Sequence, residues 1–157
     1  MFSLNRLENK DIFIDIPKSD FNGIVFYIIR NSRFSDKKKL FNRILEREKI
    51  GTTAIGDNTA IPHCRMEDFE GIYVKFALFR KDAGYVAPNG DEIRFLFLIV
   101  GPNNNPGYYL RTLSHIAKIM KNPDVRKELL QAKNKKEVRR IFRIYENAEW
   151  EKIYSWK

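Results

Sequence analysis

The sequence contains one cysteine and two histidines, and these low numbers exclude several kinds of site. Cys64 cannot form a disulfide within the chain, which favours a reducing compartment. A structural zinc site needs Cys and His ligands at set spacings, and His63, Cys64 and His115 do not provide them. We therefore predict that the protein binds no metal and needs no cofactor, and we interpret Cys64 as a small packing residue.

Long apolar runs and two common catalytic motifs are missing as well. No run approaches the about 20 apolar residues that span a bilayer, and the first residues lack the apolar region of a signal peptide, so we predict a cytoplasmic protein without a membrane span. Gly51 and Gly56 are spaced as in a phosphate-binding P-loop, but Asp57 and Asn58 follow where that loop needs Gly-Lys. No G-x-S-x-G motif of a serine hydrolase is present.

Positive charge and apolar residues are abundant. The 157 residues include 29 Lys and Arg against 20 Asp and Glu, a net charge of +9. This charge favours anionic partners, but a Lys-rich solvated surface is the preferred interpretation over a dedicated polyanion site. Apolar residues make up 43% and aromatic residues 13% of the chain. This composition predicts one folded domain over residues 1–157.

Three segments have the pattern of β-strands. Residues 11–16 alternate apolar and other side chains up to Pro17, and residues 71–80 alternate in a way that predicts one polar face. Residues 92–101 are almost continuously apolar, which predicts a central strand covered on both faces. The Gly- and Thr-rich residues 51–62 predict a loop, a short strand and a second loop.

Helical spacing of apolar residues surrounds these strands. We predict helices that begin after Ser19 or Asp20, after Ser35, after Asn122 and after Asn134, each residue acting as an N-cap. A further helix is predicted from the apolar stripe Leu110, Leu113, Ile116, Ala117 and Met120. His115 falls outside that stripe, so we expect it to face solvent. Strands flanked by helices indicate an α/β fold.

The segment around His63 has the highest density of side chains that can take part in catalysis or binding. His63 follows Pro62 at the end of the Gly- and Thr-rich loop, with Arg47 upstream. A neutral imidazole can attack phosphorus and carry a phosphoryl group, and an arginine with loop amides and threonine hydroxyls can stabilise that group. We name Thr53, Gly56 and Thr59 as candidate phosphate-binding loop residues. On the residues alone, a structural histidine remains the more common outcome.

The run R-E-x-x-x-x-T-x-I-G-x-x-x-A-I-P-H from Arg47 to His63 resembles the active-site signature of the type-2 IIA proteins of the bacterial phosphotransferase system. The segments DIFIDIP, APNGDEIRFLFLIVGP and YYLRTLSHIAKIM are similar to the first strand, the central strand with its turn, and the following helix of that family. The resemblance covers nearly the whole chain. It implies a mixed β-sheet flanked by helices on both sides.

The resemblance also implies roles for individual residues. His63 corresponds to the phosphorylated histidine, and Arg47 to the arginine that stabilises it or its phosphate. The family usually has a second histidine just before the leucine that opens the later helix, and this chain has Tyr109 there. A phenol can donate a hydrogen bond but cannot become cationic. Asp57 is expected to place a negative charge near the phosphate.

The resemblance predicts a phosphoryl carrier and regulator that accepts a phosphoryl group on His63 from an HPr-like phosphocarrier protein. Its downstream partner would be a regulated protein or a separate IIB protein. Three alternatives stay open: a IIA component of fructose or mannitol uptake, an interaction module that has lost turnover, and a nucleic-acid-binding protein. The last alternative rests on a basic helix face, Lys136, Arg139, Arg140 and Arg143, and is the least favoured because no motif that reads bases accompanies it.

Overall fold

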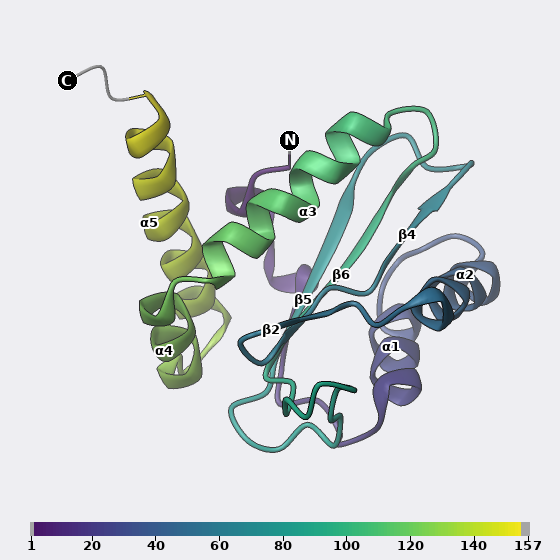
Figure 1. Ribbon diagram of the computed structural model, residues 1–157, viewed down its shortest axis with the longest axis horizontal. Coiled ribbons are helices and arrows are strands. Elements are labelled where there is room, and N and C mark those ends of the chain that lie inside the picture. Colours follow the sequence, from purple (N-terminus) through teal and green to yellow (C-terminus); the bar gives the residue numbers. More distant parts are fainter. Residues whose placement is uncertain (1, 155–157) are drawn as a thin grey trace.

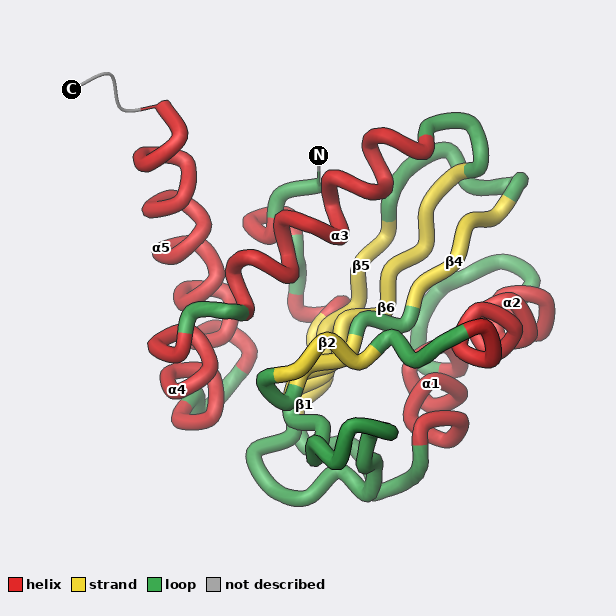
Figure 2. Tube along the Cα trace, in the orientation of Figure 1, coloured by secondary structure: helices red, strands yellow, loops and turns green. Residues whose placement is uncertain are grey.

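The computed structural model describes residues 2–154 and shows a six-stranded mixed sheet between two groups of helices (Figures 1 and 2). The strands are β1 (Ile12–Ile14), β2 (Ala54–Gly56), β3 (Thr59–Ala60), β4 (His63–Met66), β5 (Tyr73–Leu78) and β6 (Phe95–Pro102). Their order is β1-β5-β6-β3-β2, and β4 also pairs with β6. The β5–β6 and β2–β3 pairs are antiparallel and the others are parallel. The predicted fold class is therefore confirmed.

The helices form two layers, one on each face of the sheet. They are the short 3-10 turns η1 (Leu4–Arg6) and η2 (Asn9–Asp11), and the helices α1 (Phe21–Arg30), α2 (Lys37–Ile50), α3 (Pro106–Met120), α4 (Pro123–Gln131) and α5 (Lys135–Tyr154). Helices α1 and α2 cover one face, and α3, α4 and α5 with the N-terminal segment cover the other (Figure 1). No helix among the described residues is long and apolar enough to cross a bilayer.

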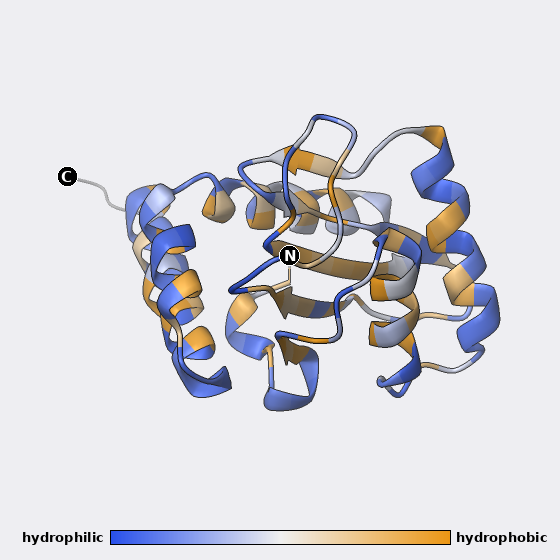
Figure 3. Cartoon of the chain, turned by 90° about the horizontal axis from the view of Figure 1, so that it is seen from below, coloured by the Kyte–Doolittle hydropathy of each residue, from blue (hydrophilic) through white to orange (hydrophobic). Residues whose placement is uncertain are grey.

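Strand β6 organises the core, as its continuous apolar run predicts. All eight of its residues are buried. Phe95, Phe97 and Ile99 pack in the cluster on the α3–α5 side, and the alternate residues of β6 pack in the cluster on the α1–α2 side. Figure 3 shows the apolar strands between helices whose polar sides face outward. The sheet is therefore covered on both faces along its centre.

Two of the predicted strand details are wrong. Residues 51–62 form not one short strand but the β2–β3 hairpin, because Asp57 and Asn58 both adopt positive φ angles of 53° and 58° and make a tight turn between the two strands. The predicted polar face of β5 faces solvent only at Tyr73. Lys75 on that face is only 8% exposed, because its ammonium group pairs with Asp11.

The caps of α1, α4 and α5 agree with the sequence. The side chains of Asp20, Asn122 and Asn134 accept hydrogen bonds from backbone N–H groups in the first turns of these helices. The predicted cap of α2 is wrong by one residue. Asp36, not Ser35, accepts from the backbone of Lys39, because Asp36 takes the left-handed conformation that turns the chain into the helix.

The predicted orientation of α3 is also wrong. His115 is 8% exposed rather than solvated, and Leu110 is 58% exposed. The cause is the second layer of structure on this side, where the Nε2 atom of His115 lies 2.7 Å from the fully buried carboxylate of Glu146 on α5. Because α5 and the N-terminal segment cover it, the buried face of α3 includes polar residues that an apolar stripe does not reveal.

Candidate phosphoryl-acceptor site

His63 is placed by strand β4, which runs parallel to β6 in the register His63 to Ile99. The backbone of Ile99 donates to the carbonyl of Pro62, which fixes the start of β4. Side chains alternate along the strand, so Cys64 is buried towards α1 and α2 while His63 points to the other side. There its ring centre lies 5.9 Å from the ring centre of Tyr109 on α3.

A chain of hydrogen bonds orients the imidazole. The Nδ1 atom of His63 lies 2.6 Å from the carbonyl oxygen of Ile61, and a carbonyl only accepts, so Nδ1 carries the proton and Nε2 keeps its lone pair. Ile61 in turn donates its N–H to the carbonyl of Thr53. The backbone N–H and the hydroxyl of Thr53 donate to the carboxylate of Glu48, at 3.1 and 2.6 Å. Glu48 therefore positions the loop that holds His63.

An open cavity of about 550 Å³ lies in front of the imidazole and brings together the three predicted catalytic residues, His63, Arg47 and Tyr109. Arg47 is in the last turn of α2, and its guanidinium donates to the carbonyl of Gly51 at 2.9 Å. Arg43 and Arg65 line the same cavity. Three guanidinium groups against one carboxylate, that of Glu46, favour an anionic ligand.

Tyr109 lies in the first turn of α3 and is 4% exposed. Its hydroxyl has no hydrogen-bond partner among the described residues. Burial raises the pKa of the Tyr109 phenol well above its usual range, so the hydroxyl keeps its proton and remains a donor. A buried donor without a partner is costly.

The ionisation of His63 suits a nucleophile. Burial lowers the pKa of His63 below its usual value, and the positive charge of Arg47 adds to this effect, while the hydrogen bond to Ile61 and the charge of Glu48 oppose it. The imidazole is therefore largely neutral at neutral pH. A neutral ring with a free Nε2 lone pair is the form that can attack phosphorus.

The structure confirms the interpretation of Cys64 as a packing residue. It is 8% exposed and belongs to the apolar cluster under α1 and α2. Burial raises the pKa of its thiol to about 12, so the thiol stays protonated and unreactive at neutral pH. Among the described residues, no group of three or more His, Cys, Asp and Glu side chains could hold a metal ion.

The three predicted loop residues do not line the cavity at His63. Thr53 acts instead through the hydrogen bonds that position Ile61. Gly56, with a φ of 88°, belongs to the β2–β3 turn, and the hydroxyl of the buried Thr59 donates to the carbonyl of Asp57. Direct phosphate binding by these residues stays a prediction. Asp57 also lies in this turn, facing Arg126 at 3.7 Å rather than the cavity.

The sequence did contain signals for residues that we had not selected. Arg65 is two positions after His63 on the same strand, and side chains two positions apart share a face. Arg43 is one helical turn before Arg47 on α2 and therefore lies on the same side of that helix. Glu48 is part of the quoted motif, but its bond to Thr53 depends on a loop conformation that only the structure shows.

Comparison with known proteins decides the family. The sequence profile described as "Phosphoenolpyruvate-dependent sugar phosphotransferase system, EIIA 2" matches residues 18–144. The chain belongs to this family. The EIIA 2 assignment agrees with the resemblance of the Arg47 to His63 motif.

Individual relatives are similar over different shares of their length. A nitrogen regulatory protein of Bradyrhizobium diazoefficiens is 31% identical over 60% of this chain, a match that spans 61% of that relative's length. A PTS system fructose-specific EIIA component of Haloferax volcanii is 28% identical over 83% of this chain and 87% of its own. The crystal structure of the nitrogen regulatory protein IIA-Ntr from Neisseria meningitidis has a TM-score of 0.79 at 26% identity, covering 88% of this chain and 97% of that one.

Proposed function

We propose that the protein is a phosphoryl carrier whose acceptor is Nε2 of His63. The observation that carries this proposal is the hydrogen bond from Nδ1 to Ile61, which leaves Nε2 with a free lone pair in a cavity that Arg43, Arg47 and Arg65 line. In the reaction, Nε2 attacks the phosphorus of a phosphohistidine on an HPr-like protein. The new N–P bond forms as the donor N–P bond breaks, and the donor imidazole leaves with the bonding electron pair.

The arginines stabilise the transferring group. In the transition state, the phosphoryl group carries negative charge on its three equatorial oxygens. Positioned cations lower the barrier to transfer by stabilising that charge. Arg47 already has one N–H bound to the carbonyl of Gly51, which restricts the orientation of the guanidinium. The hydroxyl of Tyr109 donates a hydrogen bond to an oxygen of the bound phosphoryl group. This bond supplies the partner that the buried hydroxyl lacks among the described residues.

A regulatory role is favoured over sugar transport. The relative from Bradyrhizobium diazoefficiens is named a nitrogen regulatory protein, although the match spans only part of it. In addition, the family resemblance places Tyr109 where a second histidine is usual, and a phenol cannot become cationic. The partner is then a protein that reads the phosphorylation state of His63. The fructose-specific name of the relative from Haloferax volcanii supports the second candidate, transfer to a separate IIB protein. Both roles place the protein in the cytoplasm, which fits the single free cysteine.

The test is phosphorylation of the full chain with phosphoenolpyruvate, enzyme I and an HPr-type carrier. We expect an acid-labile mass gain of about 80 Da, one phosphoryl group, that fragmentation places on His63. The variant His63→Ala should stay at its original mass. If the wild-type protein gains no mass with active donors, the phosphoryl-carrier function is refuted. The remaining function is then that of an interaction module without turnover.

A second measurement separates the two downstream roles. The phosphorylated protein is isolated and mixed with a IIB protein of the fructose or mannitol type. Rapid loss of the phosphoryl group to the IIB cysteine supports sugar transport. A phosphoryl group that stays on His63 in the presence of IIB supports the regulatory role.

A further inference from the structure

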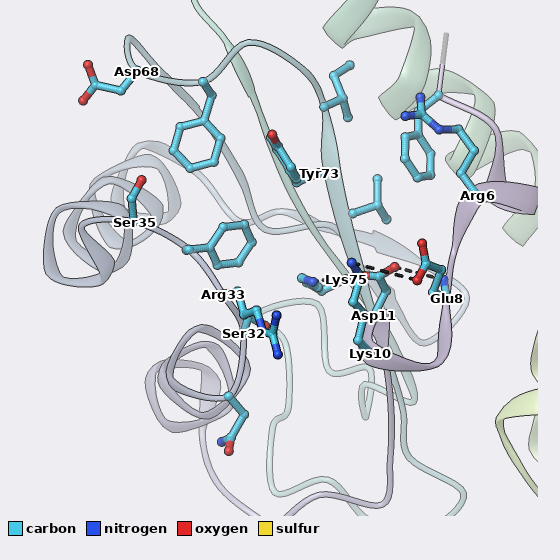
Figure 4. Close-up of a pocket in the computed structure, with 16 residues that line it drawn as sticks. Arg6, Glu8, Lys10, Asp11, Ser32, Arg33, Ser35, Asp68, Tyr73 and Lys75 are labelled. Carbon is cyan, nitrogen blue, oxygen red and sulfur yellow. Dashed lines mark hydrogen bonds and ion pairs between the residues drawn. The ribbon is translucent and has the colours of Figure 1, made fainter.

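A second cavity, of about 450 Å³, lies along the free edge of strand β5 (Figure 4). Strand β1 pairs with β5 only from Ile12 opposite Phe76, so residues 73–75 have no strand beside them on that side. The N-terminal segment and the connection between α1 and α2 form the walls. The cavity is separate from His63, because β5 and β4 lie on opposite sides of β6.

One wall of this cavity is aromatic. The rings of Phe34, Phe69 and Tyr73 contact one another with centre-to-centre distances of 5.4 to 6.3 Å. Tyr73 is 46% exposed, although its neighbours on β5 are buried. An exposed aromatic ring backed by two others is a surface on which a planar ring can stack.

The floor of the cavity has a nearly buried cation with spare donors. Lys75 is 8% exposed, and its Nζ atom lies 2.6 Å from Asp11 and 5.5 Å from the ring centre of Phe34. An ammonium group has three N–H donors, and Asp11 is its only hydrogen-bond partner among the described residues. Lys75 can therefore donate to a ligand oxygen without releasing Asp11.

The charges around the cavity leave a positive surplus. Each acidic side chain that lines it, Glu8, Asp11 and Asp68, has a lysine within ion-pair distance. Arg33 is exposed on the same cavity and has no ion pair among the described residues. The guanidinium group of Arg6 lies over the ring of Phe2 and forms no ion pair with a carboxylate of the described residues. An anionic group is the complementary ligand chemistry.

The edge of β5 adds a hydrogen-bonding pair. The carbonyl of Leu78 accepts from Asp15, so the backbone groups of Leu78 face the β1 side. Hydrogen-bonding direction alternates along a strand, so the N–H and C=O of Val74 face the same side, where no described backbone group pairs with them. A donor next to an acceptor matches the edge of a nucleobase.

We propose that this cavity binds a nucleoside monophosphate. The base stacks on the Tyr73 wall with its polar edge towards Val74, and the phosphate binds between Arg33 and Lys75. The cavity volume falls in the range of small-molecule sites, about 300–1,000 Å³. The site does not use His63, so nucleotide binding can be tested independently of the proposed phosphoryl transfer.

Isothermal titration of the full chain with AMP, GMP, CMP and UMP tests the proposal. We expect saturable binding of at least one nucleotide, with adenosine or guanosine alone and ribose 5-phosphate alone each weaker by about tenfold, because each keeps one half of the contacts. The amide signal of Val74 should shift in a nitrogen-15 spectrum on binding. No heat from any of the four at about 1 mM would overturn the proposal.

Variants separate a built site from general attraction to a basic protein. Arg33→Ala and Tyr73→Ala should each weaken binding about tenfold. Arg140→Ala removes the same charge from an exposed position on α5 and should bind like the wild type, as should His63→Ala. Equal weakening by Arg33→Ala and Arg140→Ala, or binding of ribose 5-phosphate as tight as that of the nucleotide, would show non-specific anion binding and refute the site.

Discussion

The Nδ1 atom of His63 lies 2.6 Å from the carbonyl oxygen of Ile61, two residues earlier in the same chain. Because the carbonyl can only accept, this contact fixes the proton on Nδ1 and directs the lone pair of Nε2 into the cavity with Arg47 and Tyr109. The hydrogen bonds from Ile61 through Thr53 to Glu48 hold the carbonyl in place. The tautomer of His63 thus follows from the path of a short loop.

The first prediction concerns the atom that carries the phosphoryl group. Nitrogen-15 correlation spectra of the phosphorylated protein should show phosphorus coupled to Nε2 of His63, with the proton retained on Nδ1. Glu48→Gln should weaken the support of Thr53 and slow phosphorylation by about tenfold, because the imidazole loses its fixed orientation. Glu151→Gln, at an exposed position on α5 outside this cavity, is the control. Coupling of phosphorus to Nδ1 would contradict the proposed geometry.

A second prediction concerns the pH dependence of the free protein. Burial and the charge of Arg47 hold the pKa of His63 below its usual value of about 6.5, so the neutral, nucleophilic form persists as the pH falls through 6.5. The midpoint of the fall in phosphorylation rate on acidification should therefore lie below pH 6.5.

Arg47 variants test the cause of that shift. In an NMR titration, the His63 midpoint should rise in Arg47→Ala and stay low in Arg47→Lys, which keeps the charge. Arg47→Ala should also slow phosphorylation by about a hundredfold, because it removes a donor to the transferring group. A midpoint that is the same in all three proteins would show that Arg47 does not act on His63 electrostatically.

The third prediction separates stability from chemistry at Tyr109. Tyr109→Phe removes a buried hydroxyl without a partner among the described residues, so the unphosphorylated protein should gain up to about 1 kcal/mol of unfolding free energy. The phosphohistidine should hydrolyse several-fold faster, because a phosphoryl oxygen loses the hydrogen bond from the Tyr109 hydroxyl. Tyr108→Phe is the matched control, since Tyr108 lies beside Tyr109 but lines another cavity. An unchanged phosphohistidine lifetime in Tyr109→Phe would remove Tyr109 from the site.

The fourth prediction concerns the packing that places Tyr109. A β-carbon added to Gly101 would lie 2.5 Å from Cδ2 of Tyr109, which is closer than real contacts allow. Gly101→Ala should therefore destabilise the protein by about 1–3 kcal/mol in urea unfolding and slow phosphorylation as the ring moves. Gly71→Ala, where the new methyl group meets nothing within 4 Å, should be nearly neutral. Combining Gly101→Ala with Tyr109→Ala should cost less than the sum of the two single changes.

The fifth prediction concerns the buried carboxylate of Glu146. Burial raises the pKa of Glu146, but hydrogen bonds from His115, Ser3, and the backbone of Leu4 and Asn5 outweigh it, and the net pKa is lowered. A carboxyl group with a lowered pKa in the folded state stabilises the fold above its unfolded pKa of about 4.3 and loses that contribution as the pH falls through the folded value.

The variant Glu146→Gln tests this linkage. At pH 7 it should lose about 1–3 kcal/mol of unfolding free energy, because charge-assisted hydrogen bonds to the N-terminal segment are weakened. Below about pH 4 its stability should fall less steeply than that of the wild type. Glu151→Gln, an exposed carboxylate on the same helix, should leave both the value and the slope unchanged. If the unfolding free energies of Glu146→Gln and the wild type change with pH in parallel, Glu146 does not contribute to the pH dependence of stability.

The local pattern of the sequence determined much of this protein. The apolar run of β6 predicts a strand covered on both faces, and the cap residues Asp20, Asn122 and Asn134 place three helix starts, because these features depend on neighbours in the chain. The motif from Arg47 to His63 identifies the family and the candidate nucleophile without any knowledge of packing.

Only the tertiary structure decided which groups meet. His115 is buried because Glu146 lies opposite it across two helices, and Lys75 is buried because Asp11 arrives from the N-terminal segment. The meeting of Arg65 and Tyr109 at one cavity likewise joins a strand and a helix that are distant in sequence. Such pairings depend on how separate elements pack, and the pattern within any single element does not contain that information.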